Sequence, residues 1–97
     1  MICFTVTFLV NPGSEKKAMT ILREHTNPAK PEPGVNVCRA YRSRTESRRF
    51  FVYHEITDID ATDAHRNTSD YGKFILTHLY GIIDQESLVM DTYDSLV

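Results

Sequence analysis

The stretch that most restricts the fold is residues 2–10, in which two kinds of side chain alternate without interruption. One set is wholly apolar and comprises Ile2, Phe4, Val6, Phe8 and Val10. The other set is apolar or threonine and comprises Cys3, Thr5, Thr7 and Leu9. This two-residue period, rich in β-branched and aromatic residues, is typical of a strand. Because neither face is strongly polar, the strand predicts a sheet that is covered on both sides.

A helix is expected to follow this strand. Asn11-Pro12-Gly13 carries turn residues that end the strand, and Ser14 is a suitable N-cap. Apolar residues and one histidine then recur at helical spacing: Ala18, Ile21, Leu22 and His25. Asn27-Pro28 ends the helix, since the residue before a proline disfavours helical backbone.

The middle of the chain predicts a hairpin. Pro33-Gly34 suits the central positions of a type II turn. Strands are expected at 35–42 and 49–56. The loop between them, residues 43–47, is short enough to join an antiparallel pair.

A second helical region and a final strand complete the pattern. The helical region starts near Asp58 or Asp60, is broken by a polar stretch at 67–70 and continues with an apolar stripe to Ile82. A last strand is expected at 86–93. This order predicts an α+β, ferredoxin-like βαββαβ fold with a four-stranded antiparallel sheet. Two helices would cover one face, and a homodimer packing sheet against sheet would cover the other.

The composition excludes several classes of protein. With 97 residues and 41% hydrophobic residues, the chain is expected to form a single domain, residues 1–97. A net charge of −2 gives no general attraction to nucleic acid or to anionic membranes. No apolar run approaches the roughly 18 residues of a membrane helix. Residues 1–13 have the pattern of a strand and a turn, not of a signal peptide.

The two cysteines, Cys3 and Cys38, lie in separate apolar stretches without the spacing of a zinc motif. They predict buried, reduced thiols, and neither a metal site nor a disulfide framework. A reducing cytoplasm is therefore the expected compartment.

Four local features accompany this order of elements: Pro12-Gly13 after the first strand, Glu32-Pro33-Gly34 before the second, Tyr53-His54-Glu55 at the end of the third, and Asp63-Ala64-His65 followed by Tyr71 and Phe74. Together they resemble the antibiotic biosynthesis monooxygenase (ABM) domain family over nearly the whole chain. The resemblance implies a dimeric α+β barrel. The family includes cofactor-independent monooxygenases of polycyclic aromatic quinols, haem-degrading enzymes, an isomerase-like branch of quorum-signal metabolism, and members without known activity.

The resemblance implies a monooxygenase that uses no cofactor and acts on a small aromatic or enolic compound. His65 lies at the family's histidine position. Its neutral imidazole could take a proton from a phenolic or enolic substrate, a step worth on the order of 10²–10⁴-fold in rate. The resulting anion could then react with O₂. Alternatively, His65 caps a helix end or hydrogen bonds to a backbone carbonyl.

Glu55 and Tyr71 are the other two expected catalytic residues, as groups that orient the histidine or the substrate. Glu55 could instead form an ion pair with Arg39 or Arg42 across the hairpin. Tyr71 could instead be a core aromatic residue whose hydroxyl reaches solvent.

Tyr53, Phe74 and His78 are expected to line the substrate pocket. Strand alternation puts Tyr53 on the same face as Glu55 and puts His54 on the other, and which face borders the pocket stays open. His78, like His25, could instead be a core or boundary histidine.

Two other functions remain open. The same dimeric scaffold could be a non-catalytic module for small-molecule binding or assembly. A haem-degrading enzyme is the third alternative. That branch relies on a helix histidine and a tryptophan, whereas Thr57 stands where many members carry tryptophan, and this chain contains none.

Overall fold

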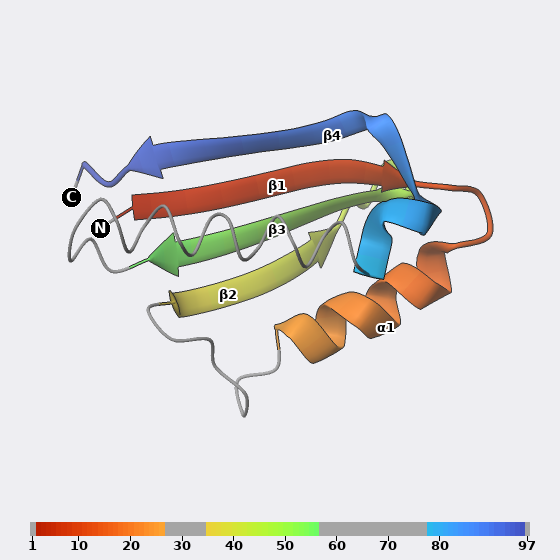
Figure 1. The fold of residues 1–97 in the computed structure, drawn as a ribbon, viewed down its shortest axis with the longest axis horizontal. Coiled ribbons are helices and arrows are strands. Elements are labelled where there is room, and N and C mark those ends of the chain that lie inside the picture. The colour runs from red at the N-terminus through yellow and green to blue at the C-terminus, as the bar shows by residue number, and fades with distance from the viewer. Residues whose placement is uncertain (1, 27–34, 57–77, 97) are drawn as a thin grey trace.

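A computed structural model describes residues 2–26, 35–56 and 78–96 (Figure 1). Over these residues the chain forms the following elements in order: β1 (Ile2–Val10), α1 (Glu15–His25), β2 (Val35–Arg42), β3 (Arg49–Ile56), the 3₁₀ helix η2 (Tyr80–Ile82) and β4 (Ile83–Asp94). The predicted turn at Pro33-Gly34, most of the predicted second helical region and its break at 67–70 lie outside the described residues.

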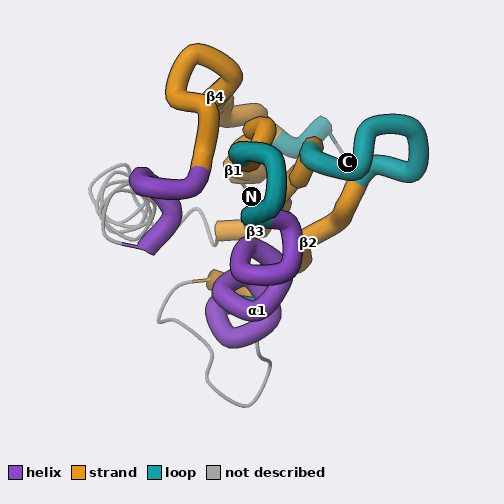
Figure 2. Tube along the Cα trace, turned by 90° about the vertical axis from the view of Figure 1, so that its right-hand side faces the viewer, coloured by secondary structure: helices purple, strands orange, loops and turns teal. Residues whose placement is uncertain are grey.

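The four strands form one sheet in the order β2-β3-β1-β4, and every neighbouring pair is antiparallel. Helix α1 lies against one face of this sheet (Figure 2). The expected α+β, ferredoxin-like fold is confirmed. The bounds predicted for the first three strands agree with the structure, whereas the predicted start of the last strand was wrong, because β4 begins at Ile83. Ile83 is buried and pairs with Val10, which extends the strand back to the end of η2.

A tight turn at Asn11–Ser14 connects β1 to α1. The Ser14 backbone N–H donates to the Asn11 carbonyl over 3.0 Å, and Gly13 adopts a φ of 89°. Pro12 and Gly13 thus occupy the central positions of a type II turn, in which only glycine accepts positive φ without strain. The Ser14 carbonyl then accepts the first helical hydrogen bond, from Ala18. The turn therefore fixes where α1 begins and lets it fold back over the sheet.

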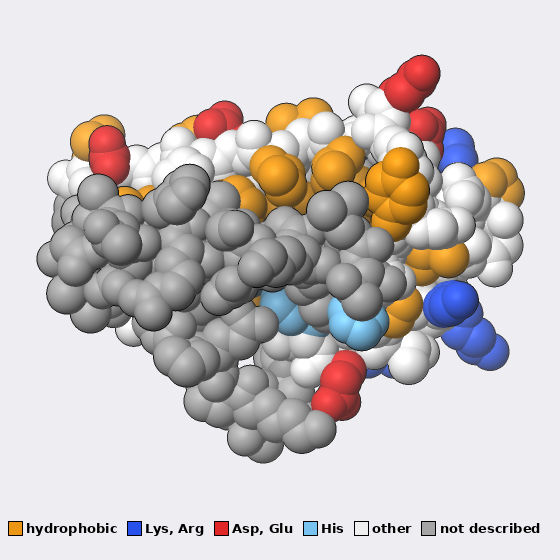
Figure 3. Space-filling model, in the orientation of Figure 1, with side chains coloured by type: hydrophobic (Ala, Val, Ile, Leu, Met, Phe, Trp, Pro, Cys, Tyr) orange, Lys and Arg blue, Asp and Glu red, His pale blue; other side chains and the backbone are white. Residues whose placement is uncertain are grey.

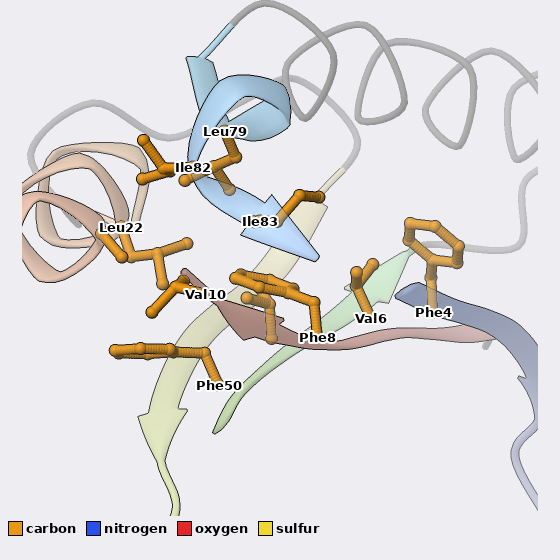
Figure 4. Packing of buried hydrophobic residues seen from close by; sticks show 11 residues of the cluster. Phe4, Val6, Phe8, Val10, Leu22, Phe50, Leu79, Ile82 and Ile83 are labelled. Carbon is orange, nitrogen blue, oxygen red and sulfur yellow. The ribbon is translucent and has the colours of Figure 1, made fainter. Parts of the chain in front are cut away.

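The hydrophobic core lies between α1, η2 and one face of the sheet (Figure 4). The alternating set Phe4, Val6, Phe8 and Val10 of β1 points into it, as the sequence predicts. From β3 it receives Phe50 and Val52, and from α1 it receives Ala18 and Leu22. Leu79, Ile82 and Ile83 close the core from the other end of the chain (Figure 4). The second face of the sheet, which carries Cys3, Thr5, Thr7 and Leu9 of β1, stays partly exposed.

Candidate functional site

Strand β3 separates the expected site residues between the two faces of the sheet. His54 lies on the core side with Phe50 and Val52 and is only 2% exposed, so it is not a surface strand residue. Tyr53 and Glu55 lie on the opposite, partly exposed face, which we call the open face. On this open face Tyr53 pairs with Thr5 of β1, and Glu55 pairs with Cys3. Strand alternation did not predict which of these residues face α1. In the structure His54 faces α1, whereas Tyr53 and Glu55 face away from it.

Three side chains with metal-binding or proton-accepting atoms meet on the α1 side. Cys38 of β2 and His54 of β3 are direct cross-strand partners, so their side chains share that face. His25, in the last turn of α1, stands over the same place, and its ring centroid lies 5.7 Å from that of His54. One ligand atom from each of the three residues lies within 4.8 Å of the others. We call these three residues the histidine–cysteine cluster.

Both histidines of this cluster are neutral near pH 7. Burial, and then the charge of His25, lowers the pKa of His54 to about 4, while the backbone of Phe4 acts in the opposite direction. Burial, and then the charge of His78, lowers the pKa of His25 to about 4. A neutral imidazole is the form that binds a metal ion or accepts a proton.

A groove of about 210 Å³ lies beside the cluster, between α1 and strands β2 and β3. Its lining is mainly apolar, with two arginines and one threonine: Met19, Leu22, Arg23, Thr26, Ala40, Tyr41, Arg42 and Phe50. The guanidinium of Arg42 lies 5.8 Å from the centroid of the Phe50 ring, and its Nε donates to the Ser47 carbonyl over 2.7 Å. Arg42 is therefore held across one end of the groove. The space-filling view shows histidine side chains at the surface, close to hydrophobic ones (Figure 3).

The open face carries aromatic and hydroxyl groups. The Tyr53 hydroxyl and the Cys3 thiol lie 3.3 Å apart and share a hydrogen bond. That bond is the main reason that the pKa of Tyr53 is raised to about 12, followed by burial. The Tyr41 and Phe51 rings pack with centroids 6.0 Å apart.

Glu55 lies opposite Cys3 on β1 and Val37 on β2. Arg42 lies opposite Phe50, on the α1 side of the sheet, whereas Glu55 lies on the open face. The ion pair between Glu55 and Arg42, one of the two alternatives from the sequence, is therefore excluded. Arg39 lies opposite Tyr53, on the same face as Glu55.

Of the remaining expected site residues, His65, Tyr71 and Phe74 lie outside the described residues. His78 is exposed, and it is close enough to His25 to lower that residue's pKa.

The sequence prediction missed the grouping of His25, Cys38 and His54. The predicted strands, 35–42 and 49–56, would place residue 38 opposite residue 53 if they were paired end to end, whereas the observed register places Cys38 opposite His54.

Comparisons with known proteins agree with this fold. The family model described as antibiotic biosynthesis monooxygenase matches residues 1–76, and the chain belongs to this family. The family is named for monooxygenases, and this membership favours an activity of that general kind. No curated protein gives a significant match. In the described part of the chain, no helix has the length and apolar character needed to cross a membrane.

Several solved structures are similar over almost their whole length. PA3566 from Pseudomonas aeruginosa is 20% identical with a TM-score of 0.73, covering 99% of this chain and 94% of that one. SO0527 from Shewanella oneidensis is 22% identical with a TM-score of 0.73, covering 95% and 87%. A protein described as antibiotic biosynthesis monooxygenase is 15% identical with a TM-score of 0.75, covering 100% of both chains. At these identities the similarity shows the shared fold.

Proposed function

We propose that this protein is a cofactor-independent monooxygenase that acts on a small aromatic or enolic compound. The groove between α1 and the sheet is the observation that carries the proposal. Its volume of about 210 Å³ exceeds the roughly 150 Å³ of an apolar cavity known to hold benzene, so one or two fused rings would fit. The groove thus combines an apolar lining, suited to an aromatic ring, with the positive charge of Arg23 and Arg42.

The positive charge suits the chemistry that such a reaction needs. Removal of a proton from a phenol or an enol leaves an anion, and a guanidinium beside it stabilises that anion. The anion supplies the electrons for O₂: one oxygen atom becomes bonded to carbon, and the other leaves as water. His65 is the proposed base, and Tyr71 is the proposed group that orients it or the substrate.

The remaining expected residues have distinct places in the proposal. Phe74 and His78 are proposed to line the substrate pocket. Tyr53 and Glu55 lie on the open face, so neither contacts a substrate in the groove directly. Any effect of Glu55 on the reaction would act through the sheet or through a partner subunit.

The open face supports a homodimer in which two sheets pack together. It presents Tyr41, Tyr93 and Val89 to solvent, and all three are large apolar or aromatic side chains. Covering such a surface is favourable, and a symmetric pair of identical faces is the simplest cover. The proposed setting is a reducing cytoplasm, in which both cysteines, Cys3 and Cys38, would stay as thiols.

Oxygen consumption with a panel of quinols, phenols and enols tests this proposal. We expect turnover of at least one compound, and we expect His65→Ala to abolish it. Arg42→Gln should lower kcat/KM about tenfold or more, because one charge-assisted hydrogen bond to the anion is worth about 1.5–3 kcal/mol. Arg44→Gln is the matched control, since Arg44 is exposed at the hairpin tip and does not line the groove.

Two results would contradict specific parts of the proposal. Unchanged turnover in His65→Ala would remove that residue as the base. If no compound consumes oxygen while one raises the melting temperature, the protein is a small-molecule binding module instead.

A further inference from the structure

We infer that His25, Cys38 and His54 form a binding site for a transition-metal ion of the zinc type. The site goes beyond the proposed oxygenation, and the two can succeed or fail separately.

The spacing of the three side chains is close to that of a zinc site. Zinc–sulfur bonds of about 2.3 Å and zinc–nitrogen bonds of about 2.0–2.1 Å place tetrahedral ligand atoms roughly 3.3–3.8 Å apart. In the structure the three ligand atoms lie within 4.8 Å of one another. Closing the remaining distance requires shifts of about 1 Å, which small rotations of side-chain dihedrals provide.

The backbone holds the three ligands on different but connected elements. Register fixes Cys38 opposite His54 in the β2–β3 pair. His25 belongs to the last turn of α1, where Leu22, one turn earlier, is buried in the core. The ring of His54 also packs beside Phe4, with centroids 5.9 Å apart. The cluster is therefore supported by residues of the core rather than by a surface loop.

The donor atoms determine the class of ion. Two imidazole nitrogens and one thiolate favour zinc or another late transition metal, whereas magnesium and calcium require oxygen ligands. Neutral imidazole nitrogens and a thiolate sulfur are the forms that coordinate such an ion. Binding would release the proton of the Cys38 thiol, leaving a site of net charge +1. Three protein ligands leave the fourth tetrahedral position for water or another ligand.

Metal titration of the purified chain tests the inference. The protein is first treated with a chelator and kept reduced with a phosphine, and then Zn²⁺ binding is measured by calorimetry. We expect one ion per chain. Co²⁺ in place of Zn²⁺ should give a thiolate-to-cobalt charge-transfer band in the near ultraviolet, which reports the sulfur ligand directly.

Matched variants locate the site. Cys38→Ser should lose the cobalt band and at least tenfold in zinc affinity, and His25→Gln should lose affinity to a similar degree. Cys3→Ser is the control, because Cys3 lies on the open face of the same sheet; it should keep the band and the affinity. Far-ultraviolet circular dichroism checks that each variant is folded. If Cys38→Ser does not fold, the zinc affinity of His25→Gln provides the test.

The inference is overturned if the unsubstituted chain binds no zinc at a stoichiometric level. It is also overturned if the folded Cys38→Ser or His25→Gln variant binds zinc as tightly as the unsubstituted chain. Loss of the cobalt band in Cys3→Ser, with the band retained in Cys38→Ser, would place the sulfur ligand on the open face and would also overturn the inference.

Discussion

At the scale of single residues, the turn before α1 depends on Gly13. Its φ of 89° lies in the left-handed region, and a Cβ added there would meet no atom within 4 Å. Any cost of a side chain at this position therefore comes from backbone strain and not from a steric clash with the rest of the molecule. Gly81 has equally open surroundings, but its φ does not lie in the left-handed region, so a side chain there would cause no backbone strain.

We expect Gly13→Ala to lower the free energy of unfolding by about 1–2 kcal/mol. Gly81→Ala should leave it unchanged or raise it by less than about 1 kcal/mol, since alanine restricts the unfolded chain without straining the folded one. Urea denaturation followed by circular dichroism measures both. Equal stability of the two variants would mean that the turn relaxes to a conformation that accepts alanine.

The positions of single side chains were also the least predictable part of the structure. The alternation of β3 predicts that His54 and Tyr53 lie on opposite faces, but alternation alone does not say which face α1 covers. The proximity of His25 to Cys38 and His54 is a tertiary fact, because it depends on how α1 crosses the sheet. Spacing along the chain therefore could not predict the histidine–cysteine cluster as a group.

At the scale of elements, the hydrophobic pattern predicted most of the structure that is described. Strands β1, β2 and β3 have the expected bounds, because each is delimited by turn residues or by a short polar loop. Strand β4 is the exception. Asp84-Gln85-Glu86 is polar and shows no alternation, so the sequence does not indicate that this stretch is paired. In the structure the strand is irregular near there, with a shift in register between Thr7 and Leu9 of β1.

That irregularity has its own hydrogen bonds. The Leu9 backbone N–H donates to the Ser87 hydroxyl oxygen over 2.8 Å, and that hydroxyl donates to the Asp84 carbonyl. The Ser87 side chain thus accepts the hydrogen bond from the Leu9 N–H, which a backbone carbonyl of β4 would accept in a regular antiparallel pair. Hydrogen bonding of this kind is set by the partner strand and has no clear signature in the local sequence.

Helix α1 is held on the sheet mainly by its buried face, and Leu22 is the largest fully buried side chain on it. We expect Leu22→Ala to lower the free energy of unfolding by about 2–5 kcal/mol, through lost burial and the cavity that remains. Leu96→Ala is the matched control, because Leu96 is 96% exposed, and its effect should stay within about 0.5 kcal/mol. Chemical denaturation of both variants measures the difference. A loss below about 1 kcal/mol for Leu22→Ala would show that α1 is not anchored at this residue.

At the scale of the whole molecule, the two faces of the sheet differ in how they are covered. One face is buried beneath α1 and η2, while the open face has no such cover among the described residues. Two adjacent residues of β4, Val89 and Met90, lie on opposite faces of the sheet. Val89 pairs with Thr7 and so lies on the open face, whereas Met90 pairs with Val6 and lies on the α1 side. Both are well exposed in the single chain, at 60% and 47%.

This pair of residues tests the proposed homodimer. Light scattering at micromolar concentration should give twice the 11.2 kDa mass of one chain. Val89→Lys should raise the dissociation constant at least tenfold, because a twofold interface brings two copies of the added charge into the apolar contact and each must lose its hydration. Met90→Lys adds the same charge to the next residue, on the face that the proposed interface does not use, and should leave the mass unchanged. A monomeric mass for the unsubstituted chain would rule out the sheet-to-sheet dimer.

If Met90→Lys dissociates the dimer and Val89→Lys does not, the contact between subunits lies on the α1 side. The open face would then need a different partner.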